Sequence, residues 1–246
     1  TIMCWWLTTS SDRFFIQHYF SLSDNGIYAV AARFGAIMQI VGAIIFQAWQ
    51  EMALRQYNSP DRDKFFSEMV NLFIMFMSIA ALCFAFGLKI VYPFIVSPEY
   101  VAGIVYVFPI IASSVLYALS NILEVGYQCS FETGRALLGV GVSAAVNILL
   151  NFVLIQTIGI YGVVVTSVVT YAVLLGFRIH DSRRYFKINI SKMSILTVAI
   201  GAVGVFPFYF TDSALVDVVM IMIGLAAMTL VAPRVLRSLR QSKRGS

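Results

Sequence analysis

Residues 136–177 read ALLGVGVSAAVNILLNFVLIQTIGIYGVVVTSVVTYAVLLGF, and these 42 positions contain no Asp, Glu, Lys or Arg. A helix needs about 20 apolar residues to cross the hydrocarbon core of a bilayer. The stretch is therefore long enough for two crossings, and Gly159 and Gly162 mark a turn between them. A charge-free run of this length favours a membrane as its surroundings.

The rest of the chain repeats this pattern. Of 246 residues, 60% are hydrophobic and 12% are charged, whereas soluble domains are about 45–50% apolar and about 25% charged. Four more stretches lack charge, at residues 69–88, 100–123, 193–211 and 218–233. We predict an all-α, polytopic transmembrane helix bundle with about eight spans. The expected spans are residues 1–20, 26–49, 67–92, 101–128, 136–156, 160–179, 192–210 and 215–236.

The basic residues between the spans predict the orientation. In alternate joints, one set holds fourteen Lys and Arg residues and the other holds only Lys89. Cytoplasmic joints carry the excess of Lys and Arg, so the N-terminal edge and the C-terminus are both expected in the cytoplasm. The formal charge of +5 therefore reports orientation and gives no reason to expect a nucleic-acid partner. The basic set is Arg55, Arg62, Lys64, Arg135, Arg178, Arg183, Arg184, Lys187, Lys192, Arg234, Arg237, Arg240, Lys243 and Arg244.

Two stretches have the character of family motifs. The first runs from Ser11 to Ile16 (SDRFFI) and continues with NGIYAVA at residues 25–31. The second is NILLNFVLI at residues 147–155, followed by GIYG at residues 159–162 and by Thr166 and Tyr171. Together they resemble the polysaccharide and O-antigen flippases of the multidrug/oligosaccharidyl-lipid/polysaccharide exporter superfamily. The resemblance extends over most of residues 5–175.

The resemblance implies a transporter with two six-helix lobes. Residues 1–180 would be the second lobe, 181–236 an additional helix pair and 237–246 a basic cytoplasmic tail, with the N-terminal lobe missing from this sequence. The implied activity is to flip an undecaprenyl-diphosphate-linked oligosaccharide from the cytoplasmic to the outer leaflet of the bacterial inner membrane. Alternating access would move this cargo for polysaccharide or O-antigen (lipopolysaccharide) biosynthesis. H⁺ or Na⁺ is the candidate coupling ion, membrane lipids are the surroundings, and no cofactor is expected.

Charged residues inside spans are costly in a membrane and are therefore the first candidates for function. Arg13 and Arg33 each lie eight residues from the turn at 21–25, which is about 12 Å along each helix. Two guanidinium groups at one depth suit a diphosphate, which accepts paired hydrogen bonds. The alternative is that Arg13 pairs with an acid and Arg33 snorkels. Asp12 is a candidate proton carrier, a counter-ion for Arg33, or a partner in a structural salt bridge.

Other polar residues inside the spans form a second group of candidates. Asn121, Glu124 and Gln128 recur at i, i+3 and i+7, which places them on one face of a helix. This polar stripe either lines a water-filled cavity or makes hydrogen bonds between helices. Gln39 is open to the same two interpretations. Asn147 and Asn151 lie four residues apart, and we expect them to form hydrogen bonds that pack helices together.

No catalytic or metal-binding constellation is visible, so we do not expect an enzyme. The cysteines at 4, 83 and 129 have no metal-ligand spacing, and His18 and His180 are isolated. One alternative keeps the superfamily but changes the cargo to a drug or another lipid precursor. A membrane-embedded glycan polymerase or ligase is disfavoured, because the outer joints are only about four to eight residues long. A further alternative is that the chain is complete and acts as a homo-oligomer in which each copy supplies one lobe.

Overall fold

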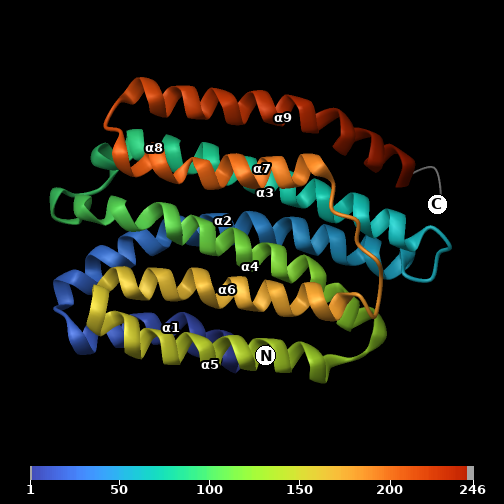
Figure 1. The fold of residues 1–246 in the computed structure, drawn as a ribbon, viewed down its shortest axis with the longest axis horizontal. Helices are drawn as coiled ribbons and strands as arrows, with labels where there is room; N and C mark the ends of the chain where they lie inside the picture. The colour runs from blue at the N-terminus through green and yellow to red at the C-terminus, as the bar shows by residue number, and fades with distance from the viewer. Residues whose placement is uncertain (1, 243–246) are drawn as a thin grey trace. The chain divides into compact units, whose positions relative to one another are not determined.

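The computed structural model describes the backbone of residues 2–242 and the side chains of residues 10–229. No β-strand occurs between residues 2 and 242, so the all-α prediction is confirmed (Figure 1). The helices are α1 (Ile2–Tyr19), α2 (Leu22–Gln56), α3 (Arg62–Ile95), the 3-10 helix η1 (Pro98–Gly103), α4 (Ile104–Ser130), α5 (Thr133–Ile158), α6 (Ile160–Ser182), α7 (Lys192–Val203), α8 (Val205–Phe210) and α9 (Ala214–Ser242).

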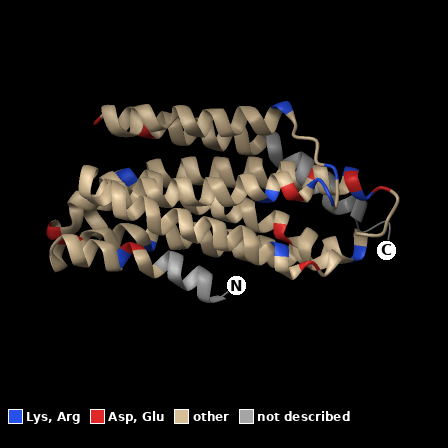
Figure 2. Cartoon of the chain, turned by 60° about the horizontal axis from the view of Figure 1, so that its bottom comes forward, with Lys and Arg blue, Asp and Glu red and all other residues tan. Residues whose placement is uncertain are grey.

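Six helical segments of the described chain are long and apolar enough to cross a membrane, which defines a multi-pass helical membrane protein. They are α2, α3, η1 with α4, α5, α6, and α7 with α8. The first and last of the eight expected spans coincide with α1 and α9, which are not among the six, so the count of eight stays a prediction. Charged residues lie mainly towards helix ends (Figure 2).

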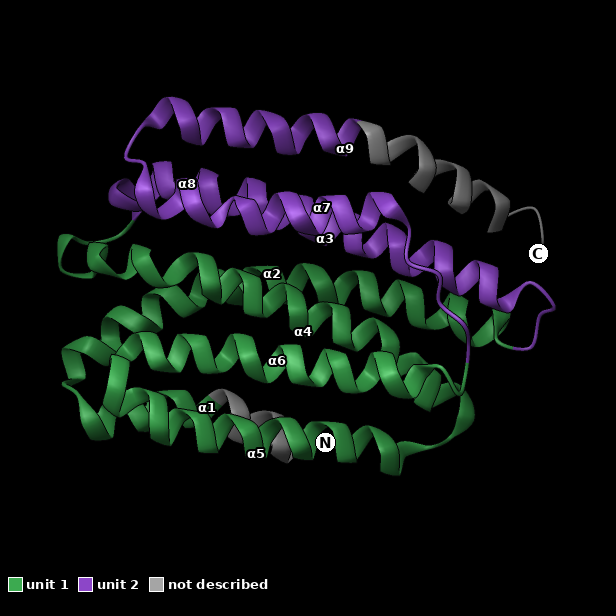
Figure 3. Cartoon of the chain, in the orientation of Figure 1, with its two compact units in different colours: residues 1–57, 96–185 green, residues 58–95, 186–246 purple. Residues whose placement is uncertain are grey.

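The chain divides into two compact units (Figure 3). Unit 1 consists of residues 1–57 and 96–185, and unit 2 of residues 58–95 and 186–246. Unit 2 therefore combines α3 with the last three helices, because α3 packs against α7 and α9. The domain boundaries expected from the sequence differ from these units. They assign the third span, residues 67–92, to the six-helix lobe of residues 1–180.

In unit 1, α4 lies between α2 and α6, α5 packs against α6, and α1 packs against α5. A glycine permits the close approach of α2 to α4, since a Cβ at Gly35 would meet the side chains of Ile110 and Ser114. Trp49 of α2 is buried against α4 and donates from Nε1 to the Ile122 carbonyl over 3.1 Å. These contacts hold α2 against α4.

Helices α5 and α6 form an antiparallel pair joined at Gly159, whose φ of 67° suits glycine. Two contacts set the register of the pair. A Cβ at Gly162 would meet the Leu154 carbonyl, and a Cβ at Gly139 would meet the Phe177 ring. Both glycines therefore let the two helices approach closely along their length.

Unit 2 is held together by polar contacts as well as by a small apolar core of Leu72, Met75 and Ile79. The amide of Asn71 donates to the Asn189 carbonyl over 2.7 Å and accepts from the Ser191 backbone over 2.8 Å. Lys89 donates to the carbonyls of Phe208 and Thr211 at the end of α8. Residues of α3 thus anchor both ends of the α7–α8 segment.

Candidate functional site

The carboxylate of Asp12 is buried inside unit 1, where its side chain is 6% exposed. Three helices donate hydrogen bonds to it. Asn151 Nδ2 of α5 lies 2.8 Å from Oδ1, and Ser167 Oγ of α6 and Tyr28 OH of α2 lie 2.8 and 3.1 Å from Oδ2. Asp12 therefore sits where α1, α2, α5 and α6 meet.

Asn147 extends this site by one helical turn of α5. Its Oδ1 accepts from Ser11 Oγ over 2.7 Å and from Asn151 Nδ2 over 3.3 Å. Both asparagines are 0% exposed. The expected amide pair thus makes hydrogen bonds between helices, and its partners are two consecutive residues of α1.

No cation pairs with Asp12 among the described side chains, residues 10–229. The structural salt bridge considered for Asp12 is therefore not found there. A buried carboxylate is costly unless a cation or a proton neutralises it, and donated hydrogen bonds offset only part of that cost. The site is accordingly suited to taking up a small monovalent cation, including H⁺.

Arg13 and Arg33 are both exposed, on α1 and α2, which pack against each other. Neither guanidinium takes part in an ion pair or hydrogen bond within residues 10–229. Arg13 thus projects outward while its neighbour Asp12 is buried, as the turn of about 100° per residue allows. Both cations are available to an anion from outside the chain.

The polar stripe of α4 bonds to neighbouring helices. Arg178 of α6 donates to Asn121 Oδ1 and Glu124 Oε2, each over 3.0 Å, and Gln128 Oε1 accepts from Gln50 Nε2 of α2 over 2.6 Å. The stripe therefore follows the interpretation of interhelical hydrogen bonding. The pairing is deep, since the side chain of Arg178 is 2% exposed and that of Glu124 is 24% exposed. Gln39 is half-buried.

Three of these residues are not among the candidates that the sequence predicts. Arg178 is expected in a basic joint, and the structure corrects this by placing the residue inside α6 with a buried guanidinium. Tyr28 lies within a quoted motif and Ser167 follows the quoted Thr166, yet neither was singled out. The available signal was a hydroxyl within an apolar span, and a sequence does not show whether such a hydroxyl faces inward.

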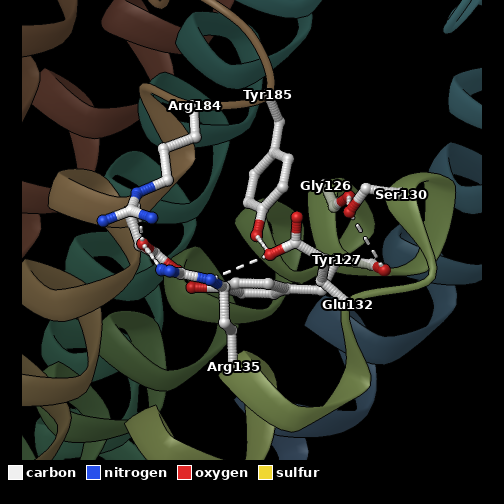
Figure 4. A network of polar contacts seen from close by, with 8 residues as sticks. Gly126, Tyr127, Ser130, Glu132, Arg135, Arg184 and Tyr185 are labelled. Carbon is white, nitrogen blue, oxygen red and sulfur yellow. Dashed lines mark hydrogen bonds and ion pairs between the residues drawn. The ribbon is translucent and has the colours of Figure 1, made fainter.

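A second polar cluster ties the ends of α4, α5 and α6 together (Figure 4). Arg135 contacts Glu132 Oε2 over 2.9 Å and Asp181 Oδ1 over 2.7 Å, and Arg184 Nε lies 3.2 Å from the same Asp181 oxygen. Tyr185 follows α6 and donates to Glu132 Oε2 over 2.9 Å. Burial, and then this hydrogen bond, raise the pKa of Tyr185 to about 12. The cluster holds the α4–α5 turn against the end of α6.

Within the described residues, no group of His, Cys, Asp and Glu is arranged to hold a metal ion. No protein-family model matches the chain, and neither the curated proteins nor the solved structures contain a match. The site geometry and the multi-pass helical fold are therefore the grounds for assigning a function.

Proposed function

We propose that this protein is an ion-coupled membrane transporter that flips an undecaprenyl-diphosphate-linked oligosaccharide from the cytoplasmic to the outer leaflet. The proposal has three parts: a coupling site at Asp12, a cationic cargo site at Arg13 and Arg33, and eight spans in the bacterial inner membrane. The observation that carries it is the buried carboxylate of Asp12, which has no ion-pair partner among the described side chains.

The coupling role follows from the surroundings of Asp12. Ionisable residues within membrane helices are typical of ion pathways and proton relays, because their cost is otherwise hard to sustain. The hydroxyls of Tyr28 and Ser167 can donate to the carboxylate and can accept from a carboxylic acid. Loading and unloading of H⁺ or Na⁺ at this point changes the charge at a junction of four helices. Such a change biases how those helices pack, and alternating access requires that bias.

The cargo role rests on charge and on the motif resemblance. Two exposed guanidinium groups on adjoining helices suit a diphosphate, whose oxygens accept bidentate hydrogen bonds. A cargo with an apolar tail would enter from the bilayer, next to the same helices. In this proposal a second six-helix lobe supplies the opposite wall of the cargo site, and the predicted eight spans place both ends of the chain in the cytoplasm.

The test uses the full-length protein in liposomes that contain a fluorescent polyprenyl-diphosphate oligosaccharide. Flipping is measured as the fraction of glycan that an externally added glycosidase can cleave, under an imposed H⁺ gradient or an imposed Na⁺ gradient. We expect one of the two gradients to accelerate flipping. Asp12→Asn should abolish that acceleration, and the exposed Asp61→Asn should leave it intact.

The cargo site is tested in the same assay. Arg13→Gln and Arg33→Gln should each reduce flipping of the diphosphate cargo without changing how the protein responds to the gradient. Gradient-driven flipping by Asp12→Asn at the wild-type rate would show that Asp12 is not the coupling site. Normal flipping by the double arginine variant would contradict the cationic cargo site.

A further inference from the structure

Four buried polar atoms on α5 and α6, the helices that also donate hydrogen bonds to Asp12, have no hydrogen-bond partner among the described residues. They are Asn147 Nδ2 and Asn151 Oδ1 on α5, and Thr166 Oγ1 and Thr170 Oγ1 on α6. All four side chains are 0% exposed. An unsatisfied buried donor or acceptor costs free energy, so four of them in one region point to a ligand that satisfies them.

The register of α5 and α6 brings the four atoms together. Gly162 lies against Leu154, and Gly139 lies against Phe177. In each of these two pairs, which define the register, the two residue numbers add up to 316. By the same rule, Asn147 lies level with residue 169 of α6, next to Thr170. The second pair follows one helical turn away, where Asn151 lies level with Val165, next to Thr166.

The direction of the two threonines agrees with this register. Gly162, Thr166 and Thr170 recur every four residues, so they form one stripe along α6. Gly162 is the member of the stripe that touches α5, at the Leu154 carbonyl. Thr166 and Thr170 therefore face α5 as well, in the region where Asn147 and Asn151 are buried.

We propose that these four side chains bind ordered water between α5 and α6, adjacent to the Asp12 site. The chemistry is complementary, because the set offers one amide donor, one amide acceptor and two hydroxyls that can serve as either. A buried water typically makes about three hydrogen bonds to otherwise unsatisfied groups. The four atoms supply the partners that such a water needs.

The bound water gives Asp12 a route for proton exchange, and this role rests on the proposed coupling function. Ser167, which donates to Asp12, lies between the two threonines in the sequence of α6. In the loading step a protonated water transfers H⁺ to the Asp12 carboxylate and becomes neutral water. In the unloading step the carboxylic acid returns that proton to water. No other species is consumed.

The first test compares thermal stability of the purified full-length protein with that of isosteric variants. Thr166→Val, Thr170→Val and the double variant remove only hydroxyls. If water bridges these hydroxyls to the asparagines, each change lowers the melting temperature and the double variant lowers it most. If the hydroxyls have no ligand, valine removes an unsatisfied buried group and the melting temperature rises. A rise would overturn the proposal.

Thr197→Val is the matched control. Thr197 is also a buried threonine in a helix, but its Oγ1 donates to the Ser194 carbonyl of its own helix over 2.9 Å. We expect a smaller decrease in melting temperature for this variant than for Thr170→Val. An equal decrease in melting temperature would mean that the loss of any buried threonine hydroxyl has this effect. That result would contradict the proposed bound water.

The second test detects the water itself by infrared difference spectroscopy between acid and neutral pH. Wild-type protein should show an O–H stretching band that shifts in heavy-oxygen water, and the double valine variant should lack it. Thr197→Val should retain it. If this band is absent from the wild type, the proposed route for proton exchange through bound water is wrong. If Asp12 shows no titrating carbonyl band but the valine variants are still destabilised, the coupling function fails and the water site stands.

Discussion

Asn151 Nδ2 donates to Asp12 Oδ1 over 2.8 Å, and this contact joins α5 to α1 through residues 139 positions apart in the chain. Both side chains are buried, and Asn151 also donates to Asn147 Oδ1. Loss of one donor to a buried carboxylate leaves that acceptor poorly satisfied. A substitution of Asn151 therefore tests directly how strongly the Asp12 site depends on its neighbours.

We expect Asn151→Ala to destabilise the protein by about 1–3 kcal/mol, the usual cost of leaving a buried polar partner unsatisfied. Thermal unfolding in detergent measures it, and the exposed Asn58→Ala serves as the control. In the double variant with Asp12→Ala, the two costs should add up to more than the observed loss, because the residues interact. Strict additivity would show that the contact contributes nothing.

Glu124 and Arg178 provide a second prediction, because one partner is almost fully buried. Glu124→Ala leaves the guanidinium of Arg178 without its carboxylate, and its Nε already lacks a partner among the described residues. Removing one member of a buried ion pair costs about 3–5 kcal/mol. We expect about 2–3 kcal/mol here, since Glu124 is itself partly accessible to solvent.

The matched comparison is the exposed pair Glu51–Arg55 on α2, whose side chains are 71% and 73% exposed. Glu51→Ala should cost less than about 1 kcal/mol, as is usual for surface pairs. Equal melting temperatures for Glu124→Ala and Glu51→Ala would mean that the Arg178 pair is not a stabilising contact between α4 and α6.

The sequence alone predicted the helical class and singled out Asp12 and Glu124, since unbalanced charges inside apolar runs are visible without a structure. It did not identify Ser167 or Tyr28, because an isolated hydroxyl in an apolar span carries no sign of the direction in which it points. Arg178 was hidden for a different reason. It adjoins a cluster of basic residues that the orientation of the spans already accounts for. Only the burial of its side chain distinguishes Arg178 from that cluster.

The partners of α3 were also beyond the reach of the sequence. Its apolar pattern predicts a span, but an apolar span packs equally well against several others. The polar contacts of Asn71 and Lys89, which tie α3 to the α7–α8 segment, become interpretable only when their partners are known. These partners are backbone groups, the carbonyls of Asn189 and Phe208 and the N–H of Ser191, and backbone groups have no sequence signature.

The close packing of α5 and α6 gives a third prediction. A Cβ at Gly162 would clash with the Leu154 carbonyl, whereas a Cβ at Gly176 would meet nothing within 4 Å. We expect Gly162→Ala to cost about 1–3 kcal/mol, the range for overpacking. Gly176→Ala on the same helix should be neutral or stabilising by up to about 1 kcal/mol, through helix propensity. Thermal unfolding distinguishes them, and identical effects would contradict the close approach.

Tyr185 provides a prediction about pH, because its pKa is raised from 10.0 to about 12 by burial and by the hydrogen bond to Glu132. The folded protein thus holds the Tyr185 proton more tightly than the unfolded chain does. The stabilisation is fully present below pH 10.0 and is lost as the pH rises towards about 12. Tyr185→Phe removes the titrating hydroxyl, so its stability should fall less steeply over that interval.

The measurement is a series of thermal unfolding curves in alkaline buffers, with the difference between wild type and Tyr185→Phe plotted against pH. Tyr19→Phe is the control, since Tyr19 is 38% exposed. For Tyr185→Phe the difference should be constant below pH 10.0 and should shrink above it, as the wild type loses the contact that the variant never had. Parallel curves up to about pH 12 would mean that Tyr185 and Glu132 do not hold the α4–α5 turn against the end of α6.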